Sequence, residues 1–338
     1  MLESSSSYVH LLDHKGIVHG HYFDRAGHVY DAGWARVKNW QPGEGFLWLH
    51  LDRNDSGVRT WLEADSGLER GVREALLVEE PHPHSLIVGD ALVVFLRGVN
   101  LNPNANPDDL VTVRIWLEVS RVISLRGPRL LVAQDIDDRI KMHGEPATAG
   151  DFLVIMVSRL LDRLGSVLEE MEDQLDSLEE DLLDNALNKE FRSTLRRLRR
   201  QSIALRRYIA PQSNVISNLA QERVSWLTDL HRARLRELAQ RNLRYVEDLG
   251  AMRERIIVID EELSALTNEQ INHTIFILSI ITAIFLPLSF VTGLLGINVG
   301  GIPGATSEWG FIGVCAFLAL IVGLELLLIY QFLKKRQV

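Results

Sequence analysis

Two uninterrupted apolar segments near the end of the chain limit most strongly what it can fold into. Residues 275–295 contain no charged side chain, and residues 311–332 contain only Glu325. Each segment has about 20 residues, enough for a helix to cross a hydrocarbon core of about 30 Å. A buried helix in a soluble protein would explain one such segment. Two in succession predict a pair of transmembrane helices, 275–295 and 311–332.

The charges next to these segments predict their orientation. Three basic residues lie in the C-terminal tail, 333–338, whereas the loop 296–310 contains Glu308 and no lysine or arginine. Because basic residues collect on the cytoplasmic side, we expect both ends of the chain in the cytoplasm and the loop outside. The first residues lack the basic start and the apolar core of a signal peptide, so we expect the N-terminal part to stay in the cytoplasm.

The remaining composition argues against several classes of protein. The chain has a net charge of −9 and a single cysteine, Cys315. One cysteine forms neither a disulfide framework nor a cysteine-based zinc site. The negative charge argues against a nucleic-acid partner. No nucleophile, phosphate-binding loop or pair of carboxylates has a setting that favours catalysis, so we expect neither an enzyme nor a resident cofactor.

The sequence before the apolar segments predicts a cytoplasmic α/β domain over 1–150. Segments rich in β-branched and aromatic residues and bounded by Gly, Asn and Pro are typical of strands. They are residues 46–52, 85–90, 91–99, 111–119 and 121–126. Short helices are expected at 58–65 and 68–77. With the helices that follow, this domain indicates an α+β membrane protein.

From Asp151 the spacing of apolar residues becomes that of long helices. One coiled-coil seam consists of Leu164, Leu168, Met171, Leu175, Leu178 and Leu182, and a second of Phe191, Leu195, Leu198, Ser202, Leu205 and Ile209. Two antiparallel helices joined near Asn185 satisfy both seams, so we expect a helical hairpin over 151–228. Proline lacks a backbone N–H, so Pro211 is expected to disturb or end the second helix.

The two helices of this hairpin carry opposite charges. Acidic residues crowd the first helix from Glu169 to Asp184, and arginines crowd the second from Arg192 to Arg207. One interpretation is that two solvated faces neutralise each other. The other is that the acidic helix gathers cations near a pore.

A stalk helix is expected over 229–274, with Thr228 or Asp229 as its cap. The first proline after this start is Pro287. The stalk can therefore continue into the first transmembrane segment as one helix of about 65 residues, or about 100 Å. A single chain does not bury so long a rod, and we expect it to pack against copies of itself.

Small or polar residues alternate with aliphatic ones along one face of this helix. They are spaced four and three apart: Asn268, Asn272, Ile275, Ser279, Thr282, Leu286, Ser289 and Gly293. Hydroxyl groups in membrane helices can serve packing, through bonds to backbone carbonyls or neighbouring helices. Alternatively, a symmetric bundle turns each position into a ring around a pore. Polar rings then offer neutral oxygens to a hydrated cation, and aliphatic rings form constrictions.

The residues that end the first transmembrane segment resemble a known family. The sequence PLSFVTGLLGIN, 287–298, is similar to the end of the first span in the CorA family of divalent-cation transporters, which closes on a Gly-Met-Asn signature. Here the signature reads Gly296, Ile297 and Asn298. The following VGGIPG resembles the ZntB branch of that family, whereas the magnesium-type loop carries an acidic Met-Pro-Glu-Leu stretch.

The resemblance implies a funnel-shaped homopentamer, a multi-pass protein of the cell inner membrane. The first span of each chain would line the pore, and a ring of Asn298 would receive the hydrated ion at the external mouth. The ZntB branch implies zinc uptake coupled to protons. The residues of the stripe include none of the Cys, His or carboxylate ligands that zinc favours. We therefore expect Zn²⁺ to cross largely hydrated, and Co²⁺, Ni²⁺ or Cd²⁺ to pass as well.

Three other functions are consistent with the sequence. The chain could be a passive magnesium, cobalt or nickel channel of the CorA type, or it could export zinc. From a different class, it could be a membrane-anchored coiled-coil scaffold that transports nothing.

Two further motifs are candidates for a site. Glu79, Glu80, His82 and His84 form the sequence EEPHPH and could hold a regulatory metal ion, although scattered surface histidines explain them too. Glu325 is an ionisable group within a transmembrane segment, which makes it a functional candidate. It could carry protons or pair with a polar group of the first span.

Overall fold

A seven-stranded mixed sheet forms the centre of the N-terminal part of the molecule. In this computed structural model, residues 14–79, 81–185, 188–297 and 308–336 are described. The strand order is β2-β1-β3-β7-β6-β5-β4. Strands β3 and β7 run parallel and the other neighbours antiparallel. The strands are β1 Ile17–Asp24, β2 Val29–Asp31, β3 Gly45–Asp52, β4 His84–Val88, β5 Ala91–Gly98, β6 Val111–Glu118 and β7 Arg121–Arg126.

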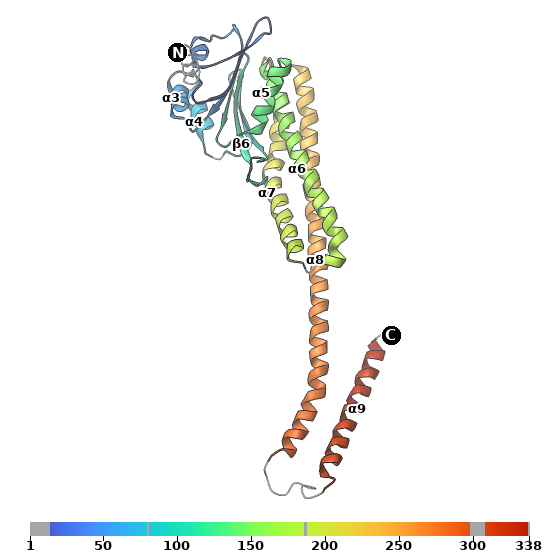
Figure 1. Cartoon of the computed structure of the whole chain (residues 1–338). Helices are drawn as coiled ribbons and strands as arrows, with labels where there is room; N and C mark the ends of the chain where they lie inside the picture. The colour runs from blue at the N-terminus through green and yellow to red at the C-terminus, as the bar shows by residue number, and fades with distance from the viewer. Residues whose placement is uncertain (1–13, 80, 186–187, 298–307, 337–338) are drawn as a thin grey trace. The chain divides into compact units, whose positions relative to one another are not determined.

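Helices cover both faces of this sheet (Figure 1). Helices α3, Ser56–Ala64, and α4, Arg70–Leu77, bury Trp61, Leu62 and Leu76 against one face. On the other face, the ring of Phe152 in the following long helix lies 5.4 Å from that of Trp48 in β3. Because both faces are covered, β5 is buried along its whole length. This explains why the strand reads as a continuous apolar run from Ala91 to Leu96 rather than an alternating one.

All five predicted strands and both predicted short helices are present. The strand predicted at 85–90 ends at Val88, because Gly89 takes a φ of 61° and begins the turn into β5. Four elements were not predicted from the sequence: β1, β2, α2 at Trp34–Asn39 and α5 at Leu131–His143.

The predicted hairpin consists of α6, Ala149–Asn185, and α7, Lys189–Leu219. Thr148 begins α6, since its hydroxyl accepts a hydrogen bond of 3.1 Å from the backbone N–H of Asp151. The buried residues of α7 include all six predicted seam positions. The join at Asn185 is therefore placed correctly.

Pro211 does not end the second helix, because α7 continues through it to Leu219. Of the two predicted effects, the ending is therefore wrong, and a local disturbance of the helix stays a prediction. The physical reason for the continuation is the packing of the last two turns. Gln212, Val215 and Ile216 are buried. The side-chain oxygen of Gln212 also accepts a hydrogen bond of 2.6 Å from the backbone N–H of Arg97 in β5. These contacts outweigh the one helical hydrogen bond that proline removes.

The stalk and the first apolar segment form one helix, α8, Asp229–Leu295, of 67 residues. Thr228 caps it, since its hydroxyl accepts from the backbone N–H of His231 at 3.3 Å. Pro287 lies within α8 and does not end it. The second apolar segment forms α9, Gly310–Arg336. The most apolar windows of α8 and α9 are not buried by any described part of the chain, as expected of helices that face lipid or other subunits.

The chain divides into two compact units, Met1–Ile259 and Asp260–Val338. The first holds the sheet, helices α2 to α7 and the beginning of α8. The second holds the rest of α8 and α9.

Candidate functional site

The polar stripe of α8 lies on a free surface of the chain. All eight positions from Asn268 to Gly293 are exposed, and the aliphatic members Ile275 and Leu286 expose 56% and 65% of their surface. Since a helix rotates by about 100° per residue, steps of four and three keep these positions near one face. This face is the candidate functional site.

The hydroxyl groups of the stripe bond to their own helix. Ser279 donates to the carbonyl oxygen of Ile275, and Thr282 to that of Leu278, each at 2.8 Å. Thr292, which lies off the stripe, does the same with Leu288. A hydroxyl that donates to its own backbone keeps its acceptor lone pairs for another ligand. These hydrogen bonds are therefore consistent with helix packing and with a pore lining. The alignment of the polar positions on one face is the observation that favours a pore lining.

The end of α8 shows why the first residue of the signature is glycine. The backbone N–H of Gly296 donates to the carbonyl oxygen of Thr292 at 2.9 Å. A Cβ atom at Gly296 would lie 3.1 Å from that same oxygen, which is closer than ordinary contact. Ile297 is exposed. Asn298 lies outside the described residues, so its role as the ion entrance stays a prediction.

Glu325 lies on α9 with one buried carboxylate oxygen, Oε2. This oxygen has no hydrogen-bond partner among the described residues. The pairing with a polar group of the first span is therefore not formed within the part of the chain that is described. Its partner in an assembly, or a role in proton transfer, stays a prediction.

The described side chains of the EEPHPH segment do not come together around one point. Those ranges contain no group of three or more His, Cys, Asp or Glu side chains arranged to hold a metal ion. The ring of His84 stacks on Phe95 at 4.4 Å, and its Nδ1 lies 2.7 Å from the carbonyl oxygen of His82. His82 stacks on Tyr208, and Glu79 is exposed. Glu80 lies outside the described residues, and the regulatory metal site stays a prediction.

A buried polar cluster that the sequence analysis did not assemble joins β1 to α5. One carboxylate oxygen of Asp137 lies 3.2 Å from His19 Nδ1 and 2.6 Å from His21 Nε2, and the other lies 2.7 Å from Lys141 Nζ. Burial opposes ionisation of Asp137, but the hydrogen bonds from Lys141 and His21 hold the pKa of Asp137 below its ordinary value. Burial lowers the pKa of His19.

His50 of β3 stacks against His19 with ring centroids 5.8 Å apart. Its Nδ1 lies 2.9 Å from the hydroxyl oxygen of Ser124, and burial lowers the pKa of His50 well below its ordinary value. The alternation of His19 and His21 in β1 was the available signal. Alternation on a strand places both rings on one face, but it does not identify Asp137 of α5 as their partner.

The comparisons with known proteins cover most of the chain. The family model of CorA-like Mg²⁺ transporter proteins matches residues 43–335. The divalent cation transporter CmaX of Pseudomonas aeruginosa is 39% identical over 309 residues, which is 90% of this chain and 93% of that protein. The zinc transport protein ZntB of Pectobacterium carotovorum is 35% identical over 312 residues, with 92% and 94% covered.

Solved structures share the fold over most of this chain. The full-length CmaX structure aligns with a TM-score of 0.80 at 37% identity, over 94% of this chain and 97% of that one. The CorA magnesium transporter of Methanocaldococcus jannaschii aligns with a TM-score of 0.78 over 92% and 97%. At 16% identity the latter likeness concerns the fold alone.

Proposed function

This chain belongs to the CorA-like Mg²⁺ transporter family, and from that membership we propose that it is a divalent cation transporter whose specific activity is zinc uptake coupled to protons. The observation that carries the proposal is the similarity to transporters over 90% or more of the chain, which includes the α8 segment with the polar stripe. No enzymatic step is needed, because the named relatives are transporters.

The choice of zinc is supported by the ZntB relatives and by the loop after α8. That loop, 296–310, has Glu308 as its one acidic residue and lacks an acidic stretch that would gather magnesium. The CmaX relative is named for divalent cations in general. Selectivity for zinc over cobalt, nickel or cadmium is therefore expected to be modest.

The pathway is the surface of α8 that the single chain leaves exposed. In a homopentamer, copies of α8 would surround an axis, and each position of the stripe would become a ring. Rings of Ser279 and Thr282 present hydroxyl oxygens whose hydrogens already bond to the backbone, so these oxygens are free to accept from the water around a hydrated cation. Rings of Ile275 and Leu286 supply apolar constrictions that control wetting.

The two ends of the pathway are assigned from the sequence. Asn298 with Gly296 and Ile297 would form the external entrance, where the amide oxygen of Asn298 receives the hydrated ion. The N-terminal domain and the C-terminal tail would lie in the cytoplasm of a cell whose inner membrane α8 and α9 cross. Glu325 is the candidate for proton coupling, since its carboxylate oxygen Oε2 has no partner in the described chain.

The test is flux of Zn²⁺ and Mg²⁺ into liposomes that contain the purified protein. We expect zinc entry that rises when the outside is made more acidic than the inside. Zinc entry that ignores the pH gradient would instead support a passive channel. A preference for magnesium would remove the zinc assignment. Flux in the opposite direction only, measured with oriented liposomes, would indicate zinc efflux.

The scaffold alternative is tested by Asn298→Ala. A transporter should lose most of its zinc flux and still assemble, as judged by size-exclusion chromatography. A scaffold has no flux to lose, and neither the wild-type protein nor the variant would carry zinc.

A further inference from the structure

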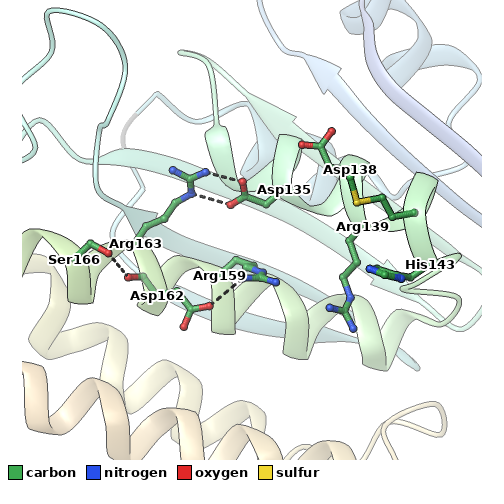
Figure 2. A pocket seen from close by; sticks show the side chains of 9 residues that line it. Asp135, Asp138, Arg139, His143, Arg159, Asp162, Arg163 and Ser166 are labelled. Atoms are coloured by element: carbon green, nitrogen blue, oxygen red, sulfur yellow. Dashed lines mark hydrogen bonds and ion pairs between the residues drawn. The ribbon is translucent and has the colours of Figure 1, made fainter.

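Two adjoining cavities lie along helices α5, α6 and α8 in the first compact unit. Their volumes are about 460 and 420 Å³, and both are lined by Arg139, Arg159 and Asp162. The first cavity, shown in Figure 2, extends between α5 and α6. The second extends between α6 and α8.

The arginines of the first cavity are largely neutralised. Arg163 reaches both carboxylate oxygens of Asp135, at 2.8 and 2.6 Å, as the two dashed lines in Figure 2 show. Arg139 pairs with Glu145 at 2.6 Å. This cavity therefore has little unmet charge to offer a ligand.

The second cavity has a different balance of charge. Its lining contains five arginines and two carboxylates: Arg139, Arg159, Arg234, Arg241, Arg244, Asp162 and Glu237. Because Arg139 also pairs with Glu145 outside this lining, two positive charges remain in excess. The chain as a whole has a net charge of −9. Such a local excess of guanidinium groups attracts anions.

The individual contacts identify which guanidinium groups are available. Arg241 is held by Asp162 at 2.5 Å and by the hydroxyl of Tyr245 at 2.8 Å. Arg159 lies 3.5 Å from Asp162, at the limit of an ion pair. Arg234 and Arg244 form no ion pair with any residue in the described ranges. Three guanidinium groups on α6 and α8 are thus free or nearly free to bind a ligand.

The cavity also has an apolar wall. Ile155 of α6 lines it with a partly exposed side chain, beside the mostly buried Val154 of α6 and Leu238 of α8. Its volume falls within the range of about 300–1,000 Å³ that is typical of small-molecule sites. The planar, fixed fork of arginine matches the oxygens of a phosphate group better than any other cationic side chain.

We propose that this cavity, named here the α6–α8 arginine cavity, binds a ligand with two or more linked phosphates next to an apolar or aromatic group, of the nucleoside di- or triphosphate class. Arg234, Arg244 and Arg159 hold the phosphates. Ile155, with the exposed edges of Val154 and Leu238, contacts the nucleoside part. The ligand bridges α6 and α8, and its charge compensates the excess positive charge of the lining. The inference is independent of which ion the protein transports.

The experiment is isothermal titration of the purified full-length protein with metal-free ATP, ADP, pyrophosphate and orthophosphate. We expect ATP and ADP to bind at least about tenfold more tightly than pyrophosphate, and orthophosphate to bind most weakly. Arg234→Gln and Arg244→Gln should each weaken ATP binding about tenfold or more. The matched control is Arg236→Gln, an exposed arginine of α8 that does not line the cavity. It should bind ATP like the wild-type protein.

Four outcomes would overturn the proposal. Absence of ATP and ADP binding would remove the site, and equal loss in Arg236→Gln would reduce it to unspecific attraction. Equal affinities for ATP and pyrophosphate would exclude a nucleoside subsite. Size-exclusion chromatography of each variant tests whether the arginines instead hold a second copy of the chain. If Arg234→Gln and Arg244→Gln alter the oligomer and leave ATP affinity unchanged, the arginines serve a second copy of the chain and not a ligand.

Discussion

The guanidinium group of Arg255 on α8 lies 2.7 Å from the carboxylate of Glu179 on α6. The same guanidinium also bonds to Asp176, and these hydrogen bonds raise the pKa of Arg255 above its ordinary value. The acidic face of α6 is therefore neutralised in part by the stalk helix. Neutralisation by the arginines of α7 was one of two interpretations drawn from the sequence, and among these arginines Arg197 bonds to the amide oxygen of Gln174 at 2.9 Å.

Loss of the Arg255 interactions should weaken the packing of α8 on α6. All three side chains are partly exposed, so Arg255→Gln is expected to cost at most about 1 kcal/mol and to lower the Tm by about 2–4 °C. The loss should shrink at high salt, where exposed ion pairs are screened. Thermal unfolding by circular dichroism measures it. Arg253→Gln, an exposed arginine on the same helix, is the control, and an equal effect there would contradict the assignment.

A bulky apolar residue on the polar stripe should block the pathway. Ser279→Leu replaces a hydroxyl oxygen by an aliphatic group, so a polar ring becomes a constriction that excludes water. We expect zinc flux in liposomes to fall at least about tenfold, which corresponds to about 1.4 kcal/mol in the barrier. Ile277→Leu, also exposed but off the stripe, should leave the flux unchanged. If both variants transport like the wild-type protein, the stripe does not line the pathway.

Glu325 should matter for the driving force rather than for passage of the ion. Glu325→Gln removes the titratable group from α9 and keeps its size. We expect zinc flux that no longer responds to an imposed pH gradient, while Glu325→Asp retains part of the response. The measurement is initial zinc entry into liposomes at several gradients. An unaltered response in Glu325→Gln would show that the proton follows another path.

The sequence predicted those elements whose apolar residues repeat without interruption. The strand 91–99 and the seam from Leu164 to Leu182 are recognisable because six apolar residues follow one another from Ala91 to Leu96 and every seam position is apolar. Strand β1 was missed because its inward side chains include His19 and His21, whose burial depends on Asp137, a residue of α5 more than a hundred positions away. No local pattern contains such a partner.

The same limit applies to the candidate sites. The polar stripe lies on one helix, so its spacing alone defines it. The α6–α8 arginine cavity brings together residues from three helices, α5, α6 and α8, and becomes visible only when those helices are packed. The predicted end of the helix at Pro211 was wrong for a related reason, since the contacts that keep α7 helical beyond it come from the sheet.

The buried histidine His50 should make the stability of the protein depend on pH. Its pKa is depressed in the folded state, so below about pH 6.5 the unfolded chain binds a proton that the folded chain does not. Stability therefore falls as the pH is lowered through this value, by up to about 1.4 kcal/mol per pH unit for one proton. His50→Gln should reduce this slope between pH 6.5 and 5.5. At pH 8.5, where the imidazole is neutral in both states, the same variant reports only the change in packing. A slope equal to that of the wild-type protein would contradict the assignment.

The hydrogen bond accepted by the buried amide of Gln212 should contribute measurably to the free energy of unfolding, although Gln212 directly follows a proline. Its Oε1 is the acceptor for the backbone N–H of Arg97, at 2.6 Å, and Gln212 itself is 1% exposed. Gln212→Leu keeps roughly the same volume but leaves that N–H without an acceptor in an apolar surrounding, which costs about 1–3 kcal/mol. We expect a matching fall in the Tm and faster amide hydrogen exchange at Arg97. Gln221→Leu, an exposed residue just after α7, should leave both unchanged. Unaltered exchange at Arg97 in Gln212→Leu would mean that the last turns of α7 are held by apolar packing alone, with Val215 and Ile216 sufficient to carry the helix past Pro211.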